Sequence, residues 1–187
     1  TGLTVLPGME LQTLEEVHVL CLFDALDQAE AWQRSVDVRY PDLLNDEEKI
    51  GEQYVVDATG KFIRKEPRML IANVRMSLEE AVEEVKALGG LVIPAHVERR
   101  AYGLLAVLGF APSIFEALEV SRHVTIEEAC RQFPEIRKFS TLQSGDVHFR
   151  DGFLGIMEFE MQAPTVAEIR LAFGGAGGRT MRITSPV

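Results

Sequence analysis

The stretch VLPGMELQTLEEVHVLCLF, residues 5–23, decides how the start of this chain folds. It holds two apolar segments with the pattern of buried strands, and each contains one ionisable side chain. Glu10 follows a Pro-Gly pair, and His18 interrupts the run VHVLCLF. A buried carboxylate or imidazole needs a polar partner, because burying it alone is costly. Taken singly, His18 could be a hydrogen-bonded core histidine and Glu10 a half-buried surface carboxylate.

Helix starts recur further along the chain. Three segments, beginning at Ser77, Thr125 and Thr165, pair a hydroxyl residue with a glutamate three positions later. This is the capping box of an α-helix N-terminus. Short apolar stretches that predict strands lie beside these helices, at 91–95, 117–120, 139–144 and 155–161. Strands that alternate with helices indicate an α/β fold with a mainly parallel sheet.

Residues from about 35 to 76 break this alternation. Two β-rich runs flank Asp57-Ala-Thr-Gly60 and predict a hairpin. We interpret the region as an insertion at the edge of the barrel or sheet, within a single domain that covers residues 1–187.

Side chains of the metal-ligand type follow or interrupt predicted strands at five positions: Glu10, His18, His96, Asp146 and His148. Residues at the carboxyl ends of parallel strands line the functional face of α/β folds. Imidazole nitrogens and carboxylate oxygens are together typical ligands of a divalent metal ion. The five residues therefore predict a metal site, with a simple turn as the alternative for Asp146 and His148. The remaining histidine, His123, is left out of the ligand set.

Composition limits the partners. The formal net charge of −10 makes extended nucleic acid an unlikely partner, although a local basic pocket for a small phosphate remains possible. No apolar run approaches the roughly 18 residues of a membrane span, so no membrane partner is expected. Cys21 and Cys130 lie far apart among apolar residues. They predict reduced core thiols in a cytoplasmic protein.

Three stretches resemble successive blocks of the PHP superfamily (polymerase and histidinol phosphatase): residues 5–23, LGGLVIPAHVER (88–99) and SGDVHFRDGFLG (144–155). The resemblance implies a distorted (β/α)7 barrel, a TIM-like architecture, and a metal-dependent phosphoesterase. It assigns Glu10 as a metal-bridging carboxylate and His18, His96 and His148 as nitrogen donors. It assigns Asp146 as a ligand or as the catalytic proton acceptor.

Two departures from the family pattern matter. Gly145 stands where the family has serine, and no histidine precedes His18, whereas PHP proteins open with His-x-His and Thr-Asp-His ligand blocks. We therefore expect the carboxyl-terminal portion of such a protein, with a barrel incomplete at its amino-terminal side. Uncovered strand edges would favour a homo-oligomer or pairing with the missing amino-terminal segment. Such a piece would bind metal weakly and hydrolyse little.

The implied reaction is hydrolysis of a phosphoester by a metal-activated water, with zinc, manganese or iron as the ion. A small phosphorylated substrate, a nucleotide or the end of an oligonucleotide fits this chemistry. Arg99 and Arg122 follow strand ends and are candidates to bind the substrate phosphate through a bidentate fork, unless they are solvated surface arginines. The alternative for the whole chain is a non-catalytic interaction or scaffold module derived from a PHP barrel.

Overall fold

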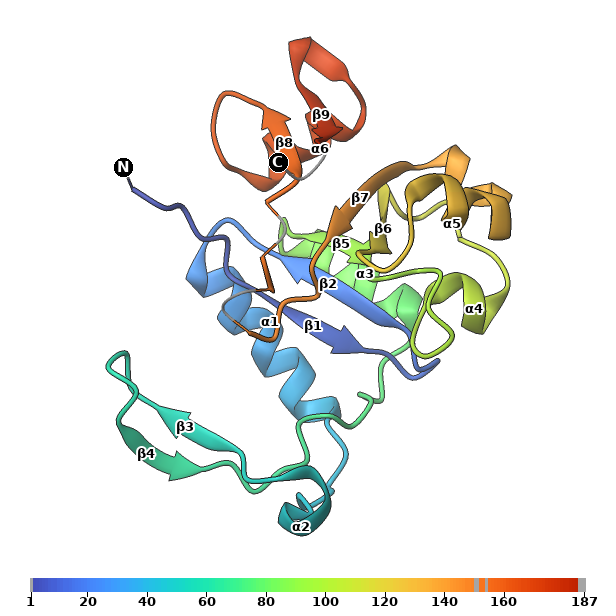
Figure 1. The fold of residues 1–187 in the computed structure, drawn as a ribbon. Coiled ribbons are helices and arrows are strands. Elements are labelled where there is room, and N and C mark those ends of the chain that lie inside the picture. The colour runs from blue at the N-terminus through green and yellow to red at the C-terminus, as the bar shows by residue number, and fades with distance from the viewer. Residues whose placement is uncertain (1, 150–151, 154, 185–187) are drawn as a thin grey trace.

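Residues 5–23 contain an antiparallel strand pair, and the chain as a whole has a mixed α/β fold (Figure 1). The computed structural model describes residues 2–149, 152–153 and 155–184. The strands are β1 (Gly8–Gln12), β2 (His18–Leu22), β3 (Tyr54–Val56), β4 (Phe62–Lys65), β5 (Leu91–Pro94), β6 (Ala117–Ser121), β7 (Ser140–Ser144), β8 (Met157–Glu160) and β9 (Thr180–Ile183). The α-helices are α1 (Leu26–Arg39), α2 (Glu47–Ile50), α3 (Leu78–Ala87), α4 (Leu104–Leu108), α5 (Ile126–Gln132) and α6 (Val166–Phe173), and short 3-10 helices span Pro134–Lys138 and Ala176–Gly178. None of the described helices combines the length and the apolar character that a membrane crossing requires.

Antiparallel pairs dominate the described strands, so the prediction of a mainly parallel sheet is wrong. β2 pairs antiparallel with both β1 and β5, and β8 pairs antiparallel with β9. Among the described strands, only β6 and β7 form a parallel ladder. The connection explains the first pair: a parallel crossover needs a dozen or more residues, and only residues 13–17 separate β1 from β2. The described strands form four separate sheets without a closed barrel, so the expected barrel is not confirmed.

Two apolar clusters lie on opposite faces of the central strands. In β2, Val19 and Cys21 belong to the larger cluster, whereas Leu20 and Leu22 pack against the smaller one. Successive residues of a strand point to opposite faces, which separates the two sets. Helices α1, α3, α4 and α5 contribute to the larger cluster, and α6 contributes to the smaller one. Apolar side chains therefore pack against both faces of the central sheet.

The predicted helix starts are confirmed at α3 and α5, where complete capping boxes form at Ser77 and Thr125. At α6, Thr165 caps the helix, but the Glu168 carboxylate instead accepts hydrogen bonds from Arg179 and from the Gln162 amide. A partner distant in sequence thus replaces half of the local motif. The predicted strands form within two residues of their expected ends. Both cysteines are free and buried, as expected.

Helix α1 was not predicted from the sequence. Of its 14 residues, only Trp32 and Val36 are buried. An apolar face this narrow gives a weak helical periodicity, and the first turn of α1 has no hydroxyl or acidic N-cap side chain. The tertiary structure, in which Trp32 and Val36 pack into the larger cluster, was needed to identify this helix.

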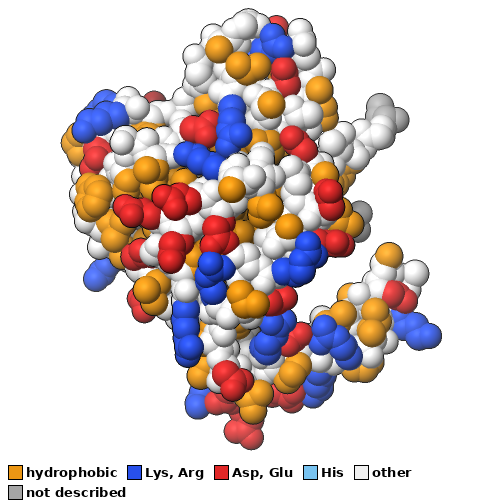
Figure 2. All heavy atoms as spheres, turned by 180° about the vertical axis from the view of Figure 1, so that it is seen from behind, with side chains coloured by type: hydrophobic (Ala, Val, Ile, Leu, Met, Phe, Trp, Pro, Cys, Tyr) orange, Lys and Arg blue, Asp and Glu red, His pale blue; other side chains and the backbone are white. Residues whose placement is uncertain are grey.

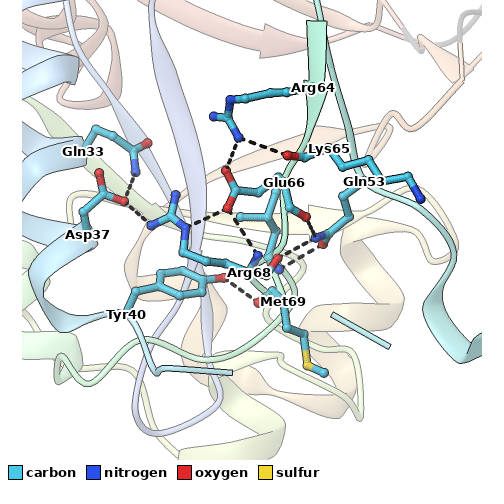
Figure 3. Close-up of polar contacts among 10 residues, drawn as sticks. Gln33, Asp37, Tyr40, Gln53, Arg64, Lys65, Glu66, Arg68 and Met69 are labelled. Carbon is cyan, nitrogen blue, oxygen red and sulfur yellow. Dashed lines mark hydrogen bonds and ion pairs between the residues drawn. The ribbon is translucent and has the colours of Figure 1, made fainter. Parts of the chain in front are cut away.

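The predicted hairpin is confirmed: β3 and β4 pair antiparallel and project from the body as an arm (Figures 1 and 2). Arg68, which follows β4, ties the base of this arm to α1 (Figure 3). Its guanidinium donates to Asp37 Oδ1 at 2.8 Å and to Glu66 Oε1 at 2.9 Å, and it lies 5.6 Å from the centre of the Tyr40 ring. Hydrogen bonds from Arg68 and then Arg64 lower the pKa of Glu66 to about 2. The single-domain organisation, with residues 35–76 as an insertion, stays a prediction.

Candidate metal centre

The register of the β1–β2 hairpin brings Glu10 and His18 to one corner of the sheet. Gln12 pairs with His18 across the ladder, and Glu10 lies on the same face of β1, two residues before Gln12. The Nδ1 atom of His18 lies 3.1 Å from Oε1 of Glu10. Glu10 was expected to follow a strand but lies within β1, and His18, expected inside a strand, is the first residue of β2. They meet because antiparallel pairing places the start of β2 beside the end of β1.

His96 reaches the same corner from the end of β5. The amide of Ala95 donates to the carbonyl oxygen of His18 at 3.0 Å, which continues the β2–β5 pairing by one residue. The Nε2 atom of His96 then lies 3.4 Å from Oε1 of Glu10, and the side chain is 2% exposed. The backbone of His96 has a φ of +33°, in a region that non-glycine residues occupy only when their surroundings enforce it. Such strain is typical of functional sites.

The three side chains form one polar group around the Glu10 carboxylate. Hydrogen bonds with His18, and then with His96, hold the pKa of Glu10 well below its usual range. The carboxylate is therefore ionised at neutral pH. One ligand atom from each of Glu10, His18 and His96 lies within 4.8 Å of the other two. We call these residues the Glu10–His18–His96 group.

Glu119, on β6, is a fourth member of the neighbourhood and was not singled out from the sequence. It is 3% exposed, and burial raises the pKa of its carboxyl group above the ordinary value, while a hydrogen bond with Ser144 opposes that change. Glu119 and Glu10 line the same recess, which has a volume of about 440 Å³. Glu119 could have been predicted from the sequence, because it is a carboxylate within the apolar stretch ALEV, residues 117–120. The same pattern identified Glu10.

Two neighbours hold the His18 ring from outside the group. Gln12 places Oε1 3.4 Å from Nε2 of His18, and the ring of Tyr102 stacks on the imidazole. The amide of His18 also donates to the carbonyl oxygen of Tyr102 at 3.0 Å. A histidine that binds metal through one nitrogen commonly donates from the other to a fixed acceptor, which sets its tautomer. Gln12 is positioned for that role if Nδ1 faces the ion.

Asp146 and His148 line the same recess as Glu10 and His96 but do not join the Glu10–His18–His96 group. The Asp146 carboxylate pairs with Arg99 at 2.7 Å and lies 3.5 Å from Nδ1 of His148. The His148 side chain is 69% exposed. Asp146 has a φ of +46°, a second strained non-glycine residue in this region. Part of the same sequence block, residues 150–151 and 154, lies outside the described residues.

The two candidate phosphate-binding arginines differ in their surroundings. Arg99 is held by Asp146 at the edge of the recess, with its side chain 39% exposed. Arg122 donates to the carbonyl oxygen of Gly152 at 2.9 Å and lines a separate hollow beside α5. Of the two arginines, Arg99 is therefore closer to the candidate metal centre, because its partner Asp146 lines the same recess as Glu10 and His96.

The Glu10–His18–His96 group fits a divalent metal ion. Ligand atoms about 2.0–2.2 Å from a tetrahedral zinc ion lie about 3.3–3.6 Å from one another. The Glu10–His18 and Glu10–His96 separations of 3.1 and 3.4 Å are close to this spacing. In addition, Nδ1 of His96 is buried and has no hydrogen-bond partner among the described residues. Two imidazoles and one carboxylate also match the ligand sets of zinc, manganese and iron.

Comparisons with known proteins bear on the fold. No protein-family model and no curated protein matches the chain. Two solved structures are similar to it: the lesion-specific endonuclease PfuEndoQ from Pyrococcus furiosus, and an Endonuclease Q complex with a 27-mer duplex substrate that carries an abasic lesion at the active site. Both have a TM-score of 0.63 and 22% sequence identity, and they cover 93% and 92% of this chain. The chain spans 40% of the length of each of those proteins.

At 22% identity, this similarity shows a shared fold and nothing finer. It also corrects one expectation. The net charge of −10 had made extended nucleic acid an unlikely partner, yet a protein with a similar fold was solved with a 27-mer duplex substrate. The expectation fails because net charge averages over the whole surface, whereas binding depends on the field at the site itself.

Proposed function

We propose that this protein hydrolyses phosphoester bonds with a divalent metal ion held by Glu10, His18 and His96. The observation that carries the proposal is the Glu10 carboxylate, which lies between two imidazoles at 3.1 and 3.4 Å. When bound, the ion would polarise the phosphoryl group and lower the pKa of a water molecule. His148 is an additional nitrogen donor at the exposed side of the recess.

The neighbouring residues have separate roles in this proposal. Arg99 binds a substrate phosphate through its guanidinium fork, oriented by its ion pair with Asp146. Asp146 accepts a proton at its carboxylate, and Arg122 contacts a more distant phosphate. Glu119 adds a carboxyl group to the wall of the recess and is held by Ser144. Three donor residues hold one ion, so we expect modest turnover.

We include nucleic acid among the substrates. The similarity to Endonuclease Q supports phosphoester hydrolysis in general, and its duplex substrate is the reason to test DNA here. Small phosphate esters remain substrates to be compared in the same assay.

The test combines metal binding with hydrolysis. Manganese is titrated into the protein by calorimetry, and cleavage of bis(p-nitrophenyl) phosphate and of a duplex oligonucleotide with an abasic site is then followed. Glu10→Gln should abolish both metal binding and cleavage. The control is Glu83→Gln, on the exposed face of α3, which should retain both. Wild-type protein that binds neither manganese nor zinc would overturn the proposal.

A further inference from the structure

A second recess lies on the other side of the Glu10–His18–His96 group, between β1, α1 and residues 70–74. It has a volume of about 610 Å³. Its walls are apolar and aromatic, and include Met9, Leu11, Val36, Tyr40, Ile71 and Tyr102. We call it the apolar recess. Glu10 and His148 line both this recess and the one that contains Asp146, so the two recesses meet at the candidate metal centre.

Two glutamine side chains add polar atoms to these walls. The Oε1 atom of Gln12 lies toward His18, and its Nε2 donates no hydrogen bond to the described residues. Gln33, on α1, uses Nε2 to donate to Asp37 at 3.1 Å, and its Oε1 has no donor among the described residues. The recess therefore offers one free donor and one free acceptor beside its apolar surface.

We propose that the apolar recess binds a planar heteroaromatic ring, a nucleobase, that belongs to the substrate. The inference rests on the proposed function for one point only, namely that the phosphate next to this base occupies the metal centre. Apolar and aromatic walls favour the faces of such a ring, and stacking of this kind accepts any base. The free amide groups fit the hydrogen-bonding edge of a base.

The position of the recess relative to the candidate metal centre supports the proposal. If the substrate phosphate binds at the metal centre, its base would lie on the side of Tyr102 and Ile71. The rest of the substrate would lie on the side of Asp146 and Glu119. By binding its base, the recess would select the nucleotide whose phosphoester bond is cleaved.

The experiment compares three probes that share parts of a nucleotide. Thymidine 5′-monophosphate and 2-deoxyribose 5-phosphate are titrated into the manganese-loaded protein by calorimetry, and thymidine is added to the metal-free protein and observed by saturation-transfer NMR. The monophosphate should bind about tenfold or more tightly than the sugar phosphate, which lacks the ring. Thymidine should give a transfer signal without metal.

Variants link these signals to the recess. Ala72→Trp fills it from the 70–74 segment, and should remove the thymidine signal and the preference for the monophosphate while manganese binding stays unchanged. Gln33→Ala, at an exposed position of α1, should reduce both signals in part, and it serves if Ala72→Trp does not fold. The matched control is Gln132→Ala, at the exposed end of α5, which should change nothing.

The outcomes separate this inference from the proposed function. Equal affinities for the two phosphates, with no thymidine signal, would overturn the ring site even if manganese binds and diesters are cleaved. A thymidine signal that Ala72→Trp removes, in a protein that binds no metal, would retain the ring site and overturn the proposed hydrolysis.

Discussion

The ring of Tyr102 stacks on the ring of His18, with centroids 4.4 Å apart and planes inclined by 2°. Tyr102 itself has a φ of +64°, and its carbonyl oxygen accepts the amide hydrogen of His18. One strained residue thus holds His18 by its backbone and by its side chain. This arrangement makes Tyr102 a positioning residue for the candidate metal centre.

Tyr102→Ala should weaken manganese binding about tenfold or more, the usual effect of losing a residue that orients a ligand. Tyr102→Phe should keep the affinity, because the stacked ring is retained. Calorimetric titration measures both. The NMR shift of the His18 ring protons should change in Tyr102→Ala and stay near the wild-type value in Tyr102→Phe. Equal affinities for all three proteins would contradict the positioning role.

Trp32 is the only tryptophan of the chain and is fully buried in the larger apolar cluster. Its indole Nε1 has no hydrogen-bond partner among the described residues. Trp32→Ala should lower the free energy of unfolding by about 3–5 kcal/mol, since it leaves a large cavity. Trp32→Phe should cost clearly less, because it removes no hydrogen bond and retains an aromatic ring. Urea denaturation followed by far-UV circular dichroism compares them; equal losses would indicate a hidden partner for the indole.

The Arg68 side chain should control the mobility of the β3–β4 arm more than global stability. Its ion pairs with Asp37 and Glu66 are partly exposed, with the Arg68 side chain 40% exposed, so the pairs contribute little to global stability. Arg68→Met should increase hydrogen exchange at the Glu66 amide, which donates to Gln53 at the base of the arm. The Val92 amide, in central strand β5, is the internal control and should exchange as in the wild type. Unchanged exchange at Glu66 would show that Arg68 does not hold the arm.

Glu168 predicts an acid-sensitive contribution to stability. Hydrogen bonds from Arg179 lower the pKa of its carboxyl group to about 2, from an ordinary value of 4.5. Because the pKa is lower in the folded state, the stabilisation is fully present above pH 4.5 and is lost as the pH falls towards 2. Glu168→Gln should lower the melting temperature at pH 7, and the difference from the wild type should shrink between pH 4.5 and pH 2. Glu83→Gln, at an exposed position on α3, should show a much smaller difference at pH 7; a Glu168→Gln effect that is constant with pH would refute the ionic contribution.

The sequence indicated most of the local structure but little of the topology. The capped starts of α3 and α5 and the hairpin at residues 57–60 depend on side chains within a few residues, and they formed as predicted. Helix α1 was missed because just two of its residues are buried, and the capping box at Thr165 formed only in part because Arg179 binds Glu168. The predicted parallel pairing was wrong, because strand pairing depends on contacts far apart in the chain, and the expected barrel is not confirmed.

The sequence alone determined which residue types were available for a metal site and on which elements they lie. Ionisable side chains in or beside apolar strands identified Glu10, His18 and His96 as candidates, because burying such a side chain without a polar partner costs free energy. Only the tertiary structure decided how they meet, through the antiparallel register of β1, β2 and β5, and which neighbours surround them. Glu119, Tyr102 and the apolar recess come from segments distant in the chain, and local sequence patterns carry no information about a distance in space.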